Sequence, residues 1–411
     1  MQCDVAIVGA GPAGATAARF LAKNGLKVIL VEKDRIPREK PCGGMLTPRV
    51  FERFKYLRSE MEKLGASSSY GTCIYPPSLT IKLQYVATRP QVLMILRKKF
   101  DHALVQMAMD SGAMLITNRV KRLVIKPDIV RILLDGNTII ESSIVVGADG
   151  VNSIVAKETD LLPILDRDKV ALCAVSELEI GENAVEECFG DRRLVHLFLG
   201  FDNLFGYAWV FPKMRHVNIG VGGLLSRTRD IKGSFMKFIR LLRKNGLIPS
   251  GLQIESYSAA LIPTGGPIER TYRDRVVLCG DAAGFVNPLT GEGVYYAMAS
   301  GEIASKVIIE ARESGKLSGQ KLSEYQTAWM EDFGKGLKIA ASFQKKIFGT
   351  TRTLEFGVKL AKADKKLMEM YVNICLRRQP INKTSIEQLL LRLPISTGKY
   401  LYKKLFERRD L

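Results

Sequence analysis

The sequence contains no segment typical of a membrane-spanning or secreted protein. No stretch of its 411 residues reaches the roughly 18 uninterrupted apolar side chains that a membrane-spanning helix needs. The chain opens on a strand-like run from Cys3 to Val8, without the basic segment, apolar core and cleavage site of a signal peptide. Hydrophobic residues make up 46% of the chain and charged residues 25%, which is ordinary for a globular protein. These features predict a folded cytoplasmic protein.

Cysteine and histidine are sparse and scattered. The seven cysteines include no C-x-x-C pair, and their number is odd. This pattern excludes a disulfide framework and argues against a zinc or iron–sulfur site, so we expect no bound metal. The three histidines, His102, His196 and His216, stand far apart in the sequence. We expect each of them to be structural.

Nucleic-acid-binding motifs are also absent, although the chain is strongly basic. The formal net charge is +19 and the isoelectric point is about 9.6. Residues 331–411 hold 18 Lys and Arg against 8 Asp and Glu, so about half of the excess lies in the last fifth of the chain. No zinc-finger spacing or aromatic RNA-binding signature accompanies the charge, which argues against a nucleic-acid partner. A solvated basic surface and a peripheral contact with the anionic inner face of the cell membrane are the two alternatives.

A glycine-rich turn near the N-terminus indicates a dinucleotide site. Gly9, Gly11 and Gly14 form a G-x-G-x-x-G motif between the strand-like run 3–8 and a helix expected over 12–24. The first glycine permits a tight turn, the second permits close approach of a pyrophosphate, and the third permits close packing of helix and strand. The free amides and the dipole of the helix would then face the phosphates.

Two carboxylates narrow the choice of dinucleotide. Glu32 ends the expected strand 27–32, where its carboxylate would bind both ribose hydroxyls and disfavour a 2′-phosphate, leaving FAD or NAD. Asp281 follows a second short strand in a Gly-Asp pair, and it can accept a hydrogen bond from a ribitol hydroxyl, which NAD lacks. A helix expected from about Gly293 would direct its positive end toward the flavin edge where charge accumulates on reduction. The pattern therefore predicts FAD as the cofactor.

The order of the expected strands and helices predicts a discontinuous α/β protein. The nucleotide-binding signals fall in the first 150 residues and again near residue 280, with a β-rich segment between them. We therefore expect a glutathione-reductase-like, Rossmann-type FAD domain with an inserted antiparallel-β substrate domain and a helical C-terminal region. No second strand–G-x-G-x-x-G–helix unit is present, so no separate nicotinamide domain is expected. The expected boundaries are 1–65, 85–168 and 255–315 for the FAD domain, 66–84 and 169–254 for the substrate domain, and 316–411 for the helical region.

Two further segments resemble the para-hydroxybenzoate-hydroxylase-like flavoproteins. Arg97 opens an expected helix in a segment similar to the arginine segment of that superfamily, and Asp149-Gly150 resembles its Asp-Gly segment. By this resemblance Arg97 would contact the FAD, and the backbone of Val120 would meet the adenine. Without the surrounding pattern, Arg97 would be interpreted as an exposed helix charge.

Two motifs narrow the resemblance to the geranylgeranyl reductase family. Cys42-Gly43-Gly44 resembles the cysteine–glycine–glycine loop of that family, and the Y-x-W-x-F-P segment beginning at Tyr207 resembles its aromatic segment. The match covers roughly residues 1–310 and is closest to the archaeal digeranylgeranylglycerophospholipid reductases, whereas the tail is matched only in general character. The resemblance implies FAD-dependent reduction of isolated C=C bonds in a polyprenyl chain, on an archaeal ether-lipid precursor.

The resemblance also implies a place for the cysteine loop. Cys42 would lie beside the isoalloxazine with the backbone of Gly43 and Gly44 close to the ring, and it is either a catalytic participant or a buried structural cysteine. No certain proton donor is identified by the sequence. The full set of expected cofactor-binding residues is Gly9, Gly11, Ala13, Gly14, Glu32, Cys42, Gly43, Gly44, Arg97, Val120, Asp281, Gly291, Gly293 and Val294.

Three aromatic residues are the expected substrate contacts. Tyr207, Trp209 and Phe211 alternate along an expected strand and therefore share one face. Such a face suits the lining of an apolar tunnel, and it equally suits a core aromatic face of the β-domain. An isolated alkene has no carbonyl to polarise, so its reduction requires a strong hydride donor and exclusion of water.

An FAD-dependent hydroxylase is the alternative function. It would share the signals at Arg97, Asp149-Gly150 and Asp281, and it would act on an aromatic or polyketide substrate with NAD(P)H and oxygen. The cysteine loop and the aromatic segment argue against it. The electron donor of a reductase is left open among NAD(P)H, ferredoxin and another reductant.

Overall fold

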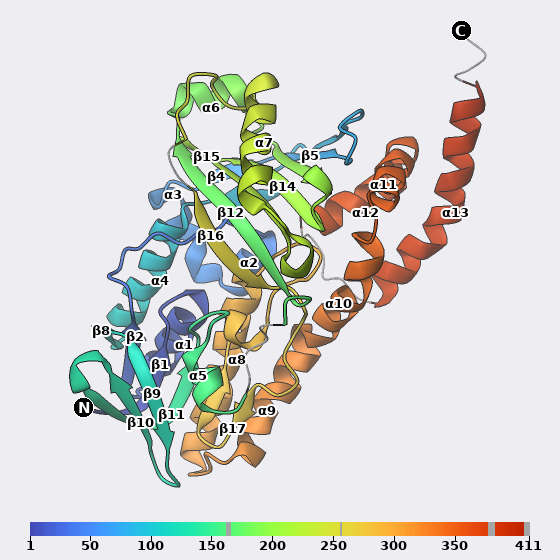
Figure 1. Cartoon of the computed structure of the whole chain (residues 1–411). Coiled ribbons are helices and arrows are strands. Elements are labelled where there is room, and N and C mark those ends of the chain that lie inside the picture. The colour runs from blue at the N-terminus through green and yellow to red at the C-terminus, as the bar shows by residue number, and fades with distance from the viewer. Residues whose placement is uncertain (162–165, 255–256, 377–382, 407–411) are drawn as a thin grey trace. The chain divides into compact units, whose positions relative to one another are not determined.

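The chain passes back and forth between two packing units, and each unit collects three separate stretches of sequence (Figure 1). The computed structural model describes residues 1–161, 166–254, 257–376 and 383–406. Unit 1 comprises Met1–Lys40, Arg97–Lys169 and Ile262–Lys338. Unit 2 comprises Pro41–Leu96, Val170–Leu261 and Ile339–Leu411.

Short apolar runs form a mostly parallel sheet in unit 1. Neighbours in the order β18-β11-β1-β2-β8 run parallel, and β9 and β10 extend the sheet antiparallel from β11. Every residue of β2 (VILVE) is buried, as expected for a parallel strand covered on both faces. The strands are β1 (Gln2–Val8), β2 (Val28–Glu32), β8 (Met114–Thr117), β9 (Val120–Ile125), β10 (Val130–Leu134), β11 (Ile139–Gly147), β17 (Tyr272–Arg273) and β18 (Val276–Leu278).

Strand β11 is continuous where the sequence pattern suggests a break. The polar run Glu141-Ser142-Ser143 predicts separate strands over 138–140 and 144–148, but the backbone stays extended through it. Ser142 pairs with Cys3 of β1 on one side and with Val130 of β10 on the other. Its hydroxyl donates to the carbonyl oxygen of Ile144 at 2.7 Å, so this polar side chain is satisfied inside the sheet.

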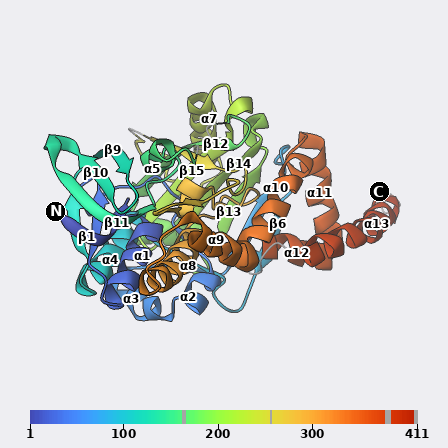
Figure 2. The same ribbon diagram turned by 90° about the horizontal axis from the view of Figure 1, so that it is seen from below.

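Small residues let the helices of unit 1 approach closely. α1 packs against α4 and α8, and a methyl group added at Gly301 of α8 would lie 2.4 Å from the carbonyl oxygen of Ala13 in α1. α8 and α9 lie side by side (Figure 2). The helices are α1 (Pro12–Lys23), α4 (Arg97–Asp110), α5 (Ile154–Glu158), α8 (Val294–Glu313), α9 (Gly319–Trp329) and α10 (Lys335–Ile347), the last of which crosses into unit 2.

Unit 2 is built on a seven-stranded sheet in the order β16-β12-β15-β14-β13-β5-β6. Its pairs from β12 to β6 are antiparallel except for β13 and β5, which run parallel. A small antiparallel sheet, β3-β7-β4, lies in the same unit. The strands are β3 (Met45–Leu46), β4 (Ser67–Ser69), β5 (Gly71–Tyr75), β6 (Leu83–Val86), β7 (Val92–Met94), β12 (Val170–Glu179), β13 (Val195–Leu199), β14 (Gly206–Pro212), β15 (His216–Leu224) and β16 (Ser258–Pro263).

The hydrophobic core of unit 2 lies on one face of this sheet. Ala208 and Val210 of β14 and Ile219 of β15 pack there with Phe235 and Phe238 of the amphipathic helix α7. α7 begins after Asp230, whose carboxylate caps the helix. The remaining helices of the first two stretches are α2 (Pro48–Arg53), α3 (Arg58–Lys63), α6 (Glu182–Phe189) and α7 (Ile231–Lys244).

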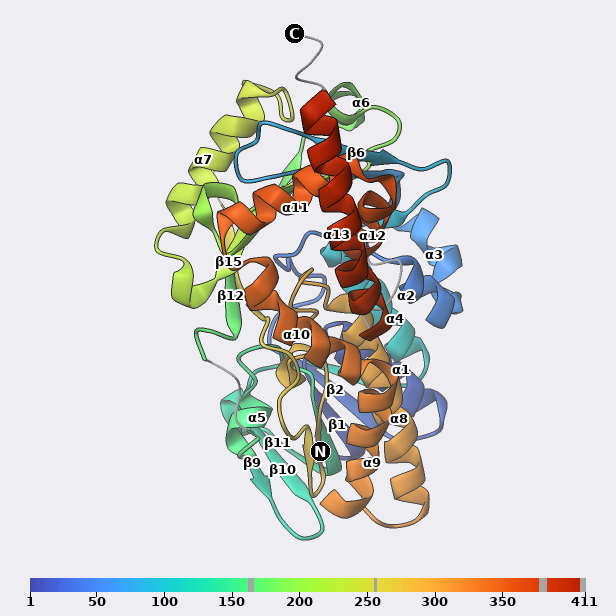
Figure 3. The ribbon, with the colours of Figure 1, turned by 90° about the vertical axis from the view of Figure 1, so that its right-hand side faces the viewer.

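The C-terminal helices α11 (Thr351–Ala363), α12 (Lys365–Cys375) and α13 (Lys383–Phe406) pack with one another (Figure 3). Val358 and Leu367 join Ile74 of β5 and Leu83 of β6 in a second apolar cluster. Within the described ranges, none of the helices combines the length and apolar character that a membrane span requires.

The two units divide the sequence differently from the domain boundaries expected from the sequence pattern. Residues 41–65 and 85–96 pack within unit 2, because β3, β4 and β7 pair with one another there. The segment 316–411 is divided, with α9 in unit 1 and α11 to α13 in unit 2. Trp329 of α9 is fully buried in unit 1, where its indole N–H donates to Thr271 at 2.9 Å.

Asp364 joins the three C-terminal helices. It is 1% exposed, caps α12 through the backbone N–H of Lys366, and accepts two hydrogen bonds from Arg392 of α13 at 2.6 and 2.8 Å. Ser396 and Lys399 also donate to it. The Arg392 guanidinium, more than any other group, holds the pKa of Asp364 well below its usual range.

We predict that Asp364→Asn loosens α13 from α11 and α12. Loss of the charged hydrogen bonds should lower the local unfolding free energy by about 2 kcal/mol, so amide exchange in α12 and α13 should be about thirtyfold faster. Because the folded pKa is depressed, this stabilisation is present above about pH 4 and is lost as the pH falls toward the folded value. The difference from wild type should therefore shrink in acid. The matched control is the exposed ion-pair residue Asp191, as Asp191→Asn; equal exchange in both variants would contradict the assignment.

Candidate active site

The three motif glycines of unit 1 have different surroundings. A methyl group at Gly9 would lie 2.4 Å from the Ala148 carbonyl oxygen, and one at Gly14 would lie 1.9 Å from the carbonyl oxygen of Gly9. Among the described residues, a methyl group at Gly11 would come within 4 Å of only the Arg38 guanidinium, at 3.9 Å. None of the described side chains caps the amide end of α1, and its first turn holds no acidic residue. The turn thus leaves an open, electropositive place beside Gly11 that suits a phosphate.

Glu32 is buried at the end of β2 with its carboxylate held in place. One oxygen accepts the backbone N–H of Ala10 at 2.9 Å, and the other accepts that of Asp34 at 3.2 Å. The Arg38 guanidinium lies 3.5 Å from the first oxygen. The carboxylate is therefore fixed next to the glycine turn, where the sequence predicts a ribose contact.

Arg97 is one end of a buried ionic chain. Its guanidinium donates to both carboxylate oxygens of Asp101, one helical turn later, at 2.8 and 3.0 Å. Asp101 also accepts from Arg38 at 3.2 Å, which links the chain to Glu32. With 9% of its side chain exposed, Arg97 is not a solvated helix charge. Sequence analysis missed Arg38 and Asp101; the i, i+4 spacing of Arg97 and Asp101 is a signal for the second, whereas Arg38 lies in a loop without a pattern.

Asp281 stands at the turn that leads into α8. It is half-buried, and no hydrogen bond to its carboxylate comes from the residues that the structure describes. Burial raises the pKa of Asp281, while the positive charges of Lys40 and Arg97 oppose this shift. A methyl group at Gly293 would lie 3.4 Å from the carboxylate, so residues 291–294 bring the amide end of α8 beside it.

Ala13 and Val120, also expected at the cofactor, occupy packing positions. A methyl group at Gly280 would lie 3.1 Å from the Ala13 side chain, and Ala13 also faces Gly301 across the α1–α8 contact. Val120 is buried at the start of β9, opposite Leu134 of β10.

These residues of unit 1 fit FAD. The open position at Gly11 and the uncapped end of α1 suit a pyrophosphate, and the carboxylate of Asp281, without a hydrogen bond from the described residues, suits a hydroxyl donor. Across the same described ranges, no three His, Cys, Asp or Glu side chains gather closely enough to hold a metal ion.

In unit 2 the cysteine loop rests directly on the aromatic strand. A methyl group at Gly43 would lie 2.5 Å from the Phe211 ring and 3.6 Å from the indole nitrogen of Trp209. Gly44 has φ +74°, and a methyl group there would lie 2.0 Å from the carbonyl oxygen of Ile95. Neither position therefore accepts a side chain without displacing the loop.

Tyr207, Trp209 and Phe211 form a continuous row on one face of β14. Ring centroids are 5.8 Å apart for Tyr207 and Trp209 and 6.1 Å apart for Trp209 and Phe211. Trp209 lies over bare backbone, since a methyl group at Gly220 of β15 would be 2.2 Å from its ring. Trp209 and Phe211 are 6% and 5% exposed, whereas Tyr207 is half-buried. The apolar core with α7 uses the opposite face.

A polar cluster that sequence analysis missed lies next to this row. Asn218 of β15 accepts the indole N–H of Trp209 at 2.8 Å and donates to the Cys42 carbonyl oxygen at 3.0 Å and to Glu177 at 2.9 Å. Glu177 also accepts from the buried ammonium of Lys213 at 2.5 Å. A signal for Asn218 is its interruption of the apolar β15 sequence (HVNIGVGGL).

Cys42 itself is partly exposed. Its sulfur accepts the backbone N–H of Gly44 at 3.4 Å. Burial, with a smaller contribution from Cys42, raises the pKa of the neighbouring Cys173 to about 12. Cys173 is therefore a neutral thiol beneath Gly222, and Cys42 is the partly exposed member of the pair.

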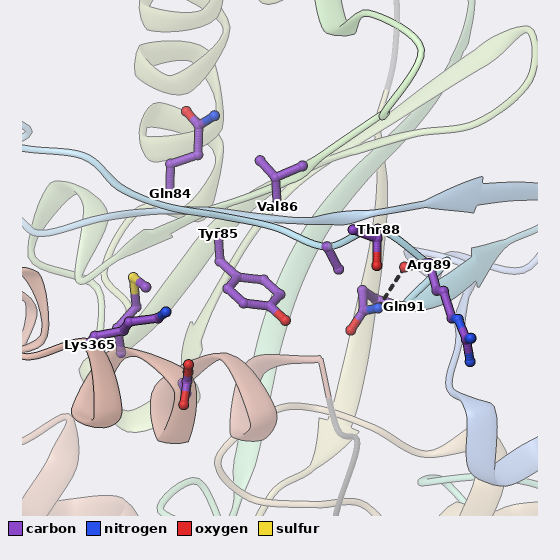
Figure 4. Close-up of a pocket in the computed structure, with 10 residues that line it drawn as sticks. Gln84, Tyr85, Val86, Thr88, Arg89, Gln91 and Lys365 are labelled. Atoms are coloured by element: carbon purple, nitrogen blue, oxygen red, sulfur yellow. Dashed lines mark hydrogen bonds between the residues drawn. The ribbon is translucent and has the colours of Figure 1, made fainter.

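A surface pocket elsewhere in unit 2 contains none of the predicted site residues. It has a volume of about 580 Å³ and lies between the β6–β7 segment and α12 (Figure 4). Its lining combines polar and charged side chains with apolar ones and includes Gln84, Tyr85, Lys365, Met368 and Glu369.

We predict that Asp281→Ala yields protein with little bound flavin. Removing this carboxylate takes away the hydrogen-bond acceptor at the turn before α8, so the FAD content after purification should fall about tenfold or more. The measurement is the ratio of visible flavin absorbance to protein absorbance. Asp128→Ala, at a fully exposed position of the same unit, should keep wild-type flavin content. Full flavin content in the Asp281 variant would remove this residue from the cofactor site.

Comparisons with known proteins show the family to which the chain belongs. A family model described as "FAD binding domain" matches residues 2–328. The digeranylgeranylglycerophospholipid reductase of Methanothrix thermoacetophila is 33% identical over 380 residues, covering 90% of this chain and 91% of its own. Digeranylgeranylglycerophospholipid reductase 1 of Methanopyrus kandleri is 32% identical over 345 residues, covering 81% and 87%. The crystal structure of a geranylgeranyl bacteriochlorophyll reductase-like protein from Thermoplasma acidophilum matches with TM-score 0.78 and 25% identity over 98% of each chain.

The match to the FAD-binding model spans most of the chain, and the two archaeal relatives exceed 30% identity over most of its length. The expected FAD cofactor and the glutathione-reductase-like α/β fold are thereby confirmed. The chain is an FAD-dependent oxidoreductase and belongs to the family of the archaeal digeranylgeranylglycerophospholipid reductases.

Proposed function

We propose that this protein reduces isolated C=C bonds in the geranylgeranyl chains of archaeal ether-lipid precursors. The observation that carries the proposal is the cysteine loop seated on the row Tyr207, Trp209 and Phe211 in unit 2. This arrangement places a polar, sulfur-bearing loop against a broad apolar face, as a prenyl chain would require. The names of the two archaeal relatives, both digeranylgeranylglycerophospholipid reductases, support the same substrate class.

The reaction adds two hydrogens to each double bond, one as hydride and one as a proton. When bound in its reduced form, FAD supplies the hydride. An isolated alkene carries no group that a hydrogen-bond donor can polarise, so the protein contributes mainly orientation and exclusion of water. Aromatic side chains hold an apolar chain without offering competing hydrogen bonds at their faces.

Individual residues take defined parts in this proposal. Glu32 and Asp281 hold hydroxyl groups of the cofactor, and Arg97 stabilises the site through Asp101. Tyr207 offers the least covered ring of the aromatic row to the substrate. Cys42 is the candidate for contact with the reacting region, because its sulfur lies on the loop and is partly exposed.

The decisive experiment is an anaerobic turnover assay. The FAD-loaded protein is reduced with dithionite, which replaces the unidentified electron donor, and digeranylgeranylglyceryl phosphate is added. We expect flavin reoxidation without oxygen and lipid products heavier by about 2 Da for each reduced bond. Flavin that stays reduced until air enters, with unchanged lipid, would overturn the proposal and favour the oxygen-dependent hydroxylase.

We also propose that α13 contacts an anionic membrane surface. Several of its large apolar side chains are exposed, with Leu391 74%, Tyr402 65% and Leu401 52% accessible, while Leu389 and Leu393 pack against the apolar cluster of β5, β6, α11 and α12. The surrounding C-terminal segment, residues 331–411, carries 18 basic against 8 acidic residues. Exposed apolar groups among basic charges favour the interface of an anionic bilayer, where a lipid substrate resides.

The corresponding prediction concerns two adjacent leucines. Replacing Leu390 and Leu391 together by Glu should lower flotation with vesicles containing anionic lipid by about tenfold, because two apolar contacts become charged. Met236→Glu, at an exposed position on α7, is the matched control and should float like wild type. Equal flotation of the double variant and the wild type would exclude α13 as the contact.

A further inference from the structure

Asn218 connects three parts of unit 2 at one buried point. It is 1% exposed, and the strand register places it between Phe211 of β14 and Glu177 of β12. Trp209, the Cys42 loop and the Lys213–Glu177 ion pair all meet at this side chain or at its direct partners. No role assigned above requires a polar residue in the middle of β15.

The hydrogen bonds fix the orientation of the Asn218 amide. The indole N–H of Trp209 can only donate, so the group 2.8 Å away must be the amide oxygen. The amide nitrogen then donates one hydrogen to the Cys42 carbonyl oxygen and the other to Glu177. Both amide hydrogens and one lone pair of the amide oxygen are thus used, and no other residue of this size offers an acceptor and two donors in this arrangement.

Lys213 supports the same loop from a second side. Its ammonium is buried, and its charge is balanced by Glu177, the carboxylate that Asn218 also contacts. A methyl group at Gly44 would lie 2.9 Å from the Lys213 nitrogen. The cluster therefore reaches the loop at both ends, at the Cys42 carbonyl and at Gly44.

We infer that Asn218 is the positioning residue of the Cys42-Gly43-Gly44 loop. By joining the Cys42 carbonyl to the Trp209 indole, it sets the spacing between the Cys42 sulfur and the aromatic row. Its effect on turnover rests on the proposed function, because the loop and the row are the groups proposed to meet the prenyl chain. The effect on the loop itself does not depend on any substrate.

Thiol labelling of the FAD-loaded protein tests the loop directly. Asn218→Leu keeps the size of the side chain but removes all three hydrogen bonds, and we expect alkylation of Cys42 by iodoacetamide to be about fivefold faster. Cys188, partly exposed on α6, is the internal reference and should react at its wild-type rate. Asn218→Ser serves the same purpose if the leucine variant does not fold. Unchanged Cys42 labelling in a folded variant overturns the inference.

Asn218→Asp separates the hydrogen bond that Asn218 accepts from Trp209 from the two that it donates to Cys42 and Glu177. Its carboxylate can still accept the Trp209 indole N–H, but when ionised it cannot donate to Cys42 or Glu177. The chain has two tryptophans, and their indole N–H signals in nitrogen-15 spectra can be compared. The Trp209 signal should keep its hydrogen-bonded position in the aspartate variant and shift in the leucine variant, while Trp329, bonded to Thr271, stays fixed in both.

Turnover gives the functional outcome. We expect kcat of Asn218→Asp to fall about tenfold or more with little change in KM or FAD content, since a small displacement of reacting groups is costly. Asn245→Asp, at an exposed position after α7, is the matched control and should turn over normally. Normal kcat in Asn218→Asp contradicts a positioning role. A wild type that reduces no prenyl lipid refutes the proposed function alone, because the labelling and indole results still decide the position of the loop.

Discussion

Close contact at glycines, which have no side chain, is the constraint on which the candidate groups of each unit depend. In unit 1, α1 can approach the turn after β1 only because Gly14 has no side chain. A methyl group there would lie 1.9 Å from the Gly9 carbonyl oxygen. In unit 2, the cysteine loop can lie on Phe211 only because Gly43 has no side chain, and the Trp209 ring can lie against Gly220 for the same reason. These glycines act by allowing contact rather than by making the chain mobile, and the polar groups around them then take fixed positions.

Buried charges near these contacts are paired with a charge of opposite sign, and Asp281 is the exception. Glu32, Arg38, Asp101 and Arg97 form a chain in which each buried charge has an opposite partner within 3.5 Å. In unit 2 the buried Lys213 is likewise balanced by Glu177. Asp281 differs, because its carboxylate receives no hydrogen bond from the described residues and burial raises its pKa. A carboxylate in that state is expected where a ligand completes the arrangement.

Most of unit 1 could be predicted from the sequence because its signals are local. The turn from Gly9 to Gly14, the strand ending at Glu32 and the Gly-Asp pair at Asp281 each combine a residue type with a neighbouring strand or helix. Arg38 was missed because its importance comes from pairing with Asp101 across 63 residues, which no periodicity records. Asp101 has one local signal, its i, i+4 spacing from Arg97. The continuous strand β11 was missed for a related reason, since its pairing with β1 and β10 on either side of Ser142 involves residues far away in the sequence.

In unit 2 the alternation of β14 predicts the shared aromatic face, but it leaves open whether that face belongs to the core. The structure favours a face outside the α7 core, because Ala208 and Val210 on the opposite face of β14 are the residues that pack with α7. The aromatic row is instead covered partly by its own cysteine loop, which buries Trp209 and Phe211 and leaves Tyr207 half-buried. This face lies opposite the core that packs with α7, carries the polar residue Asn218 and meets a glycine loop, a combination that favours a site over a purely stabilising role.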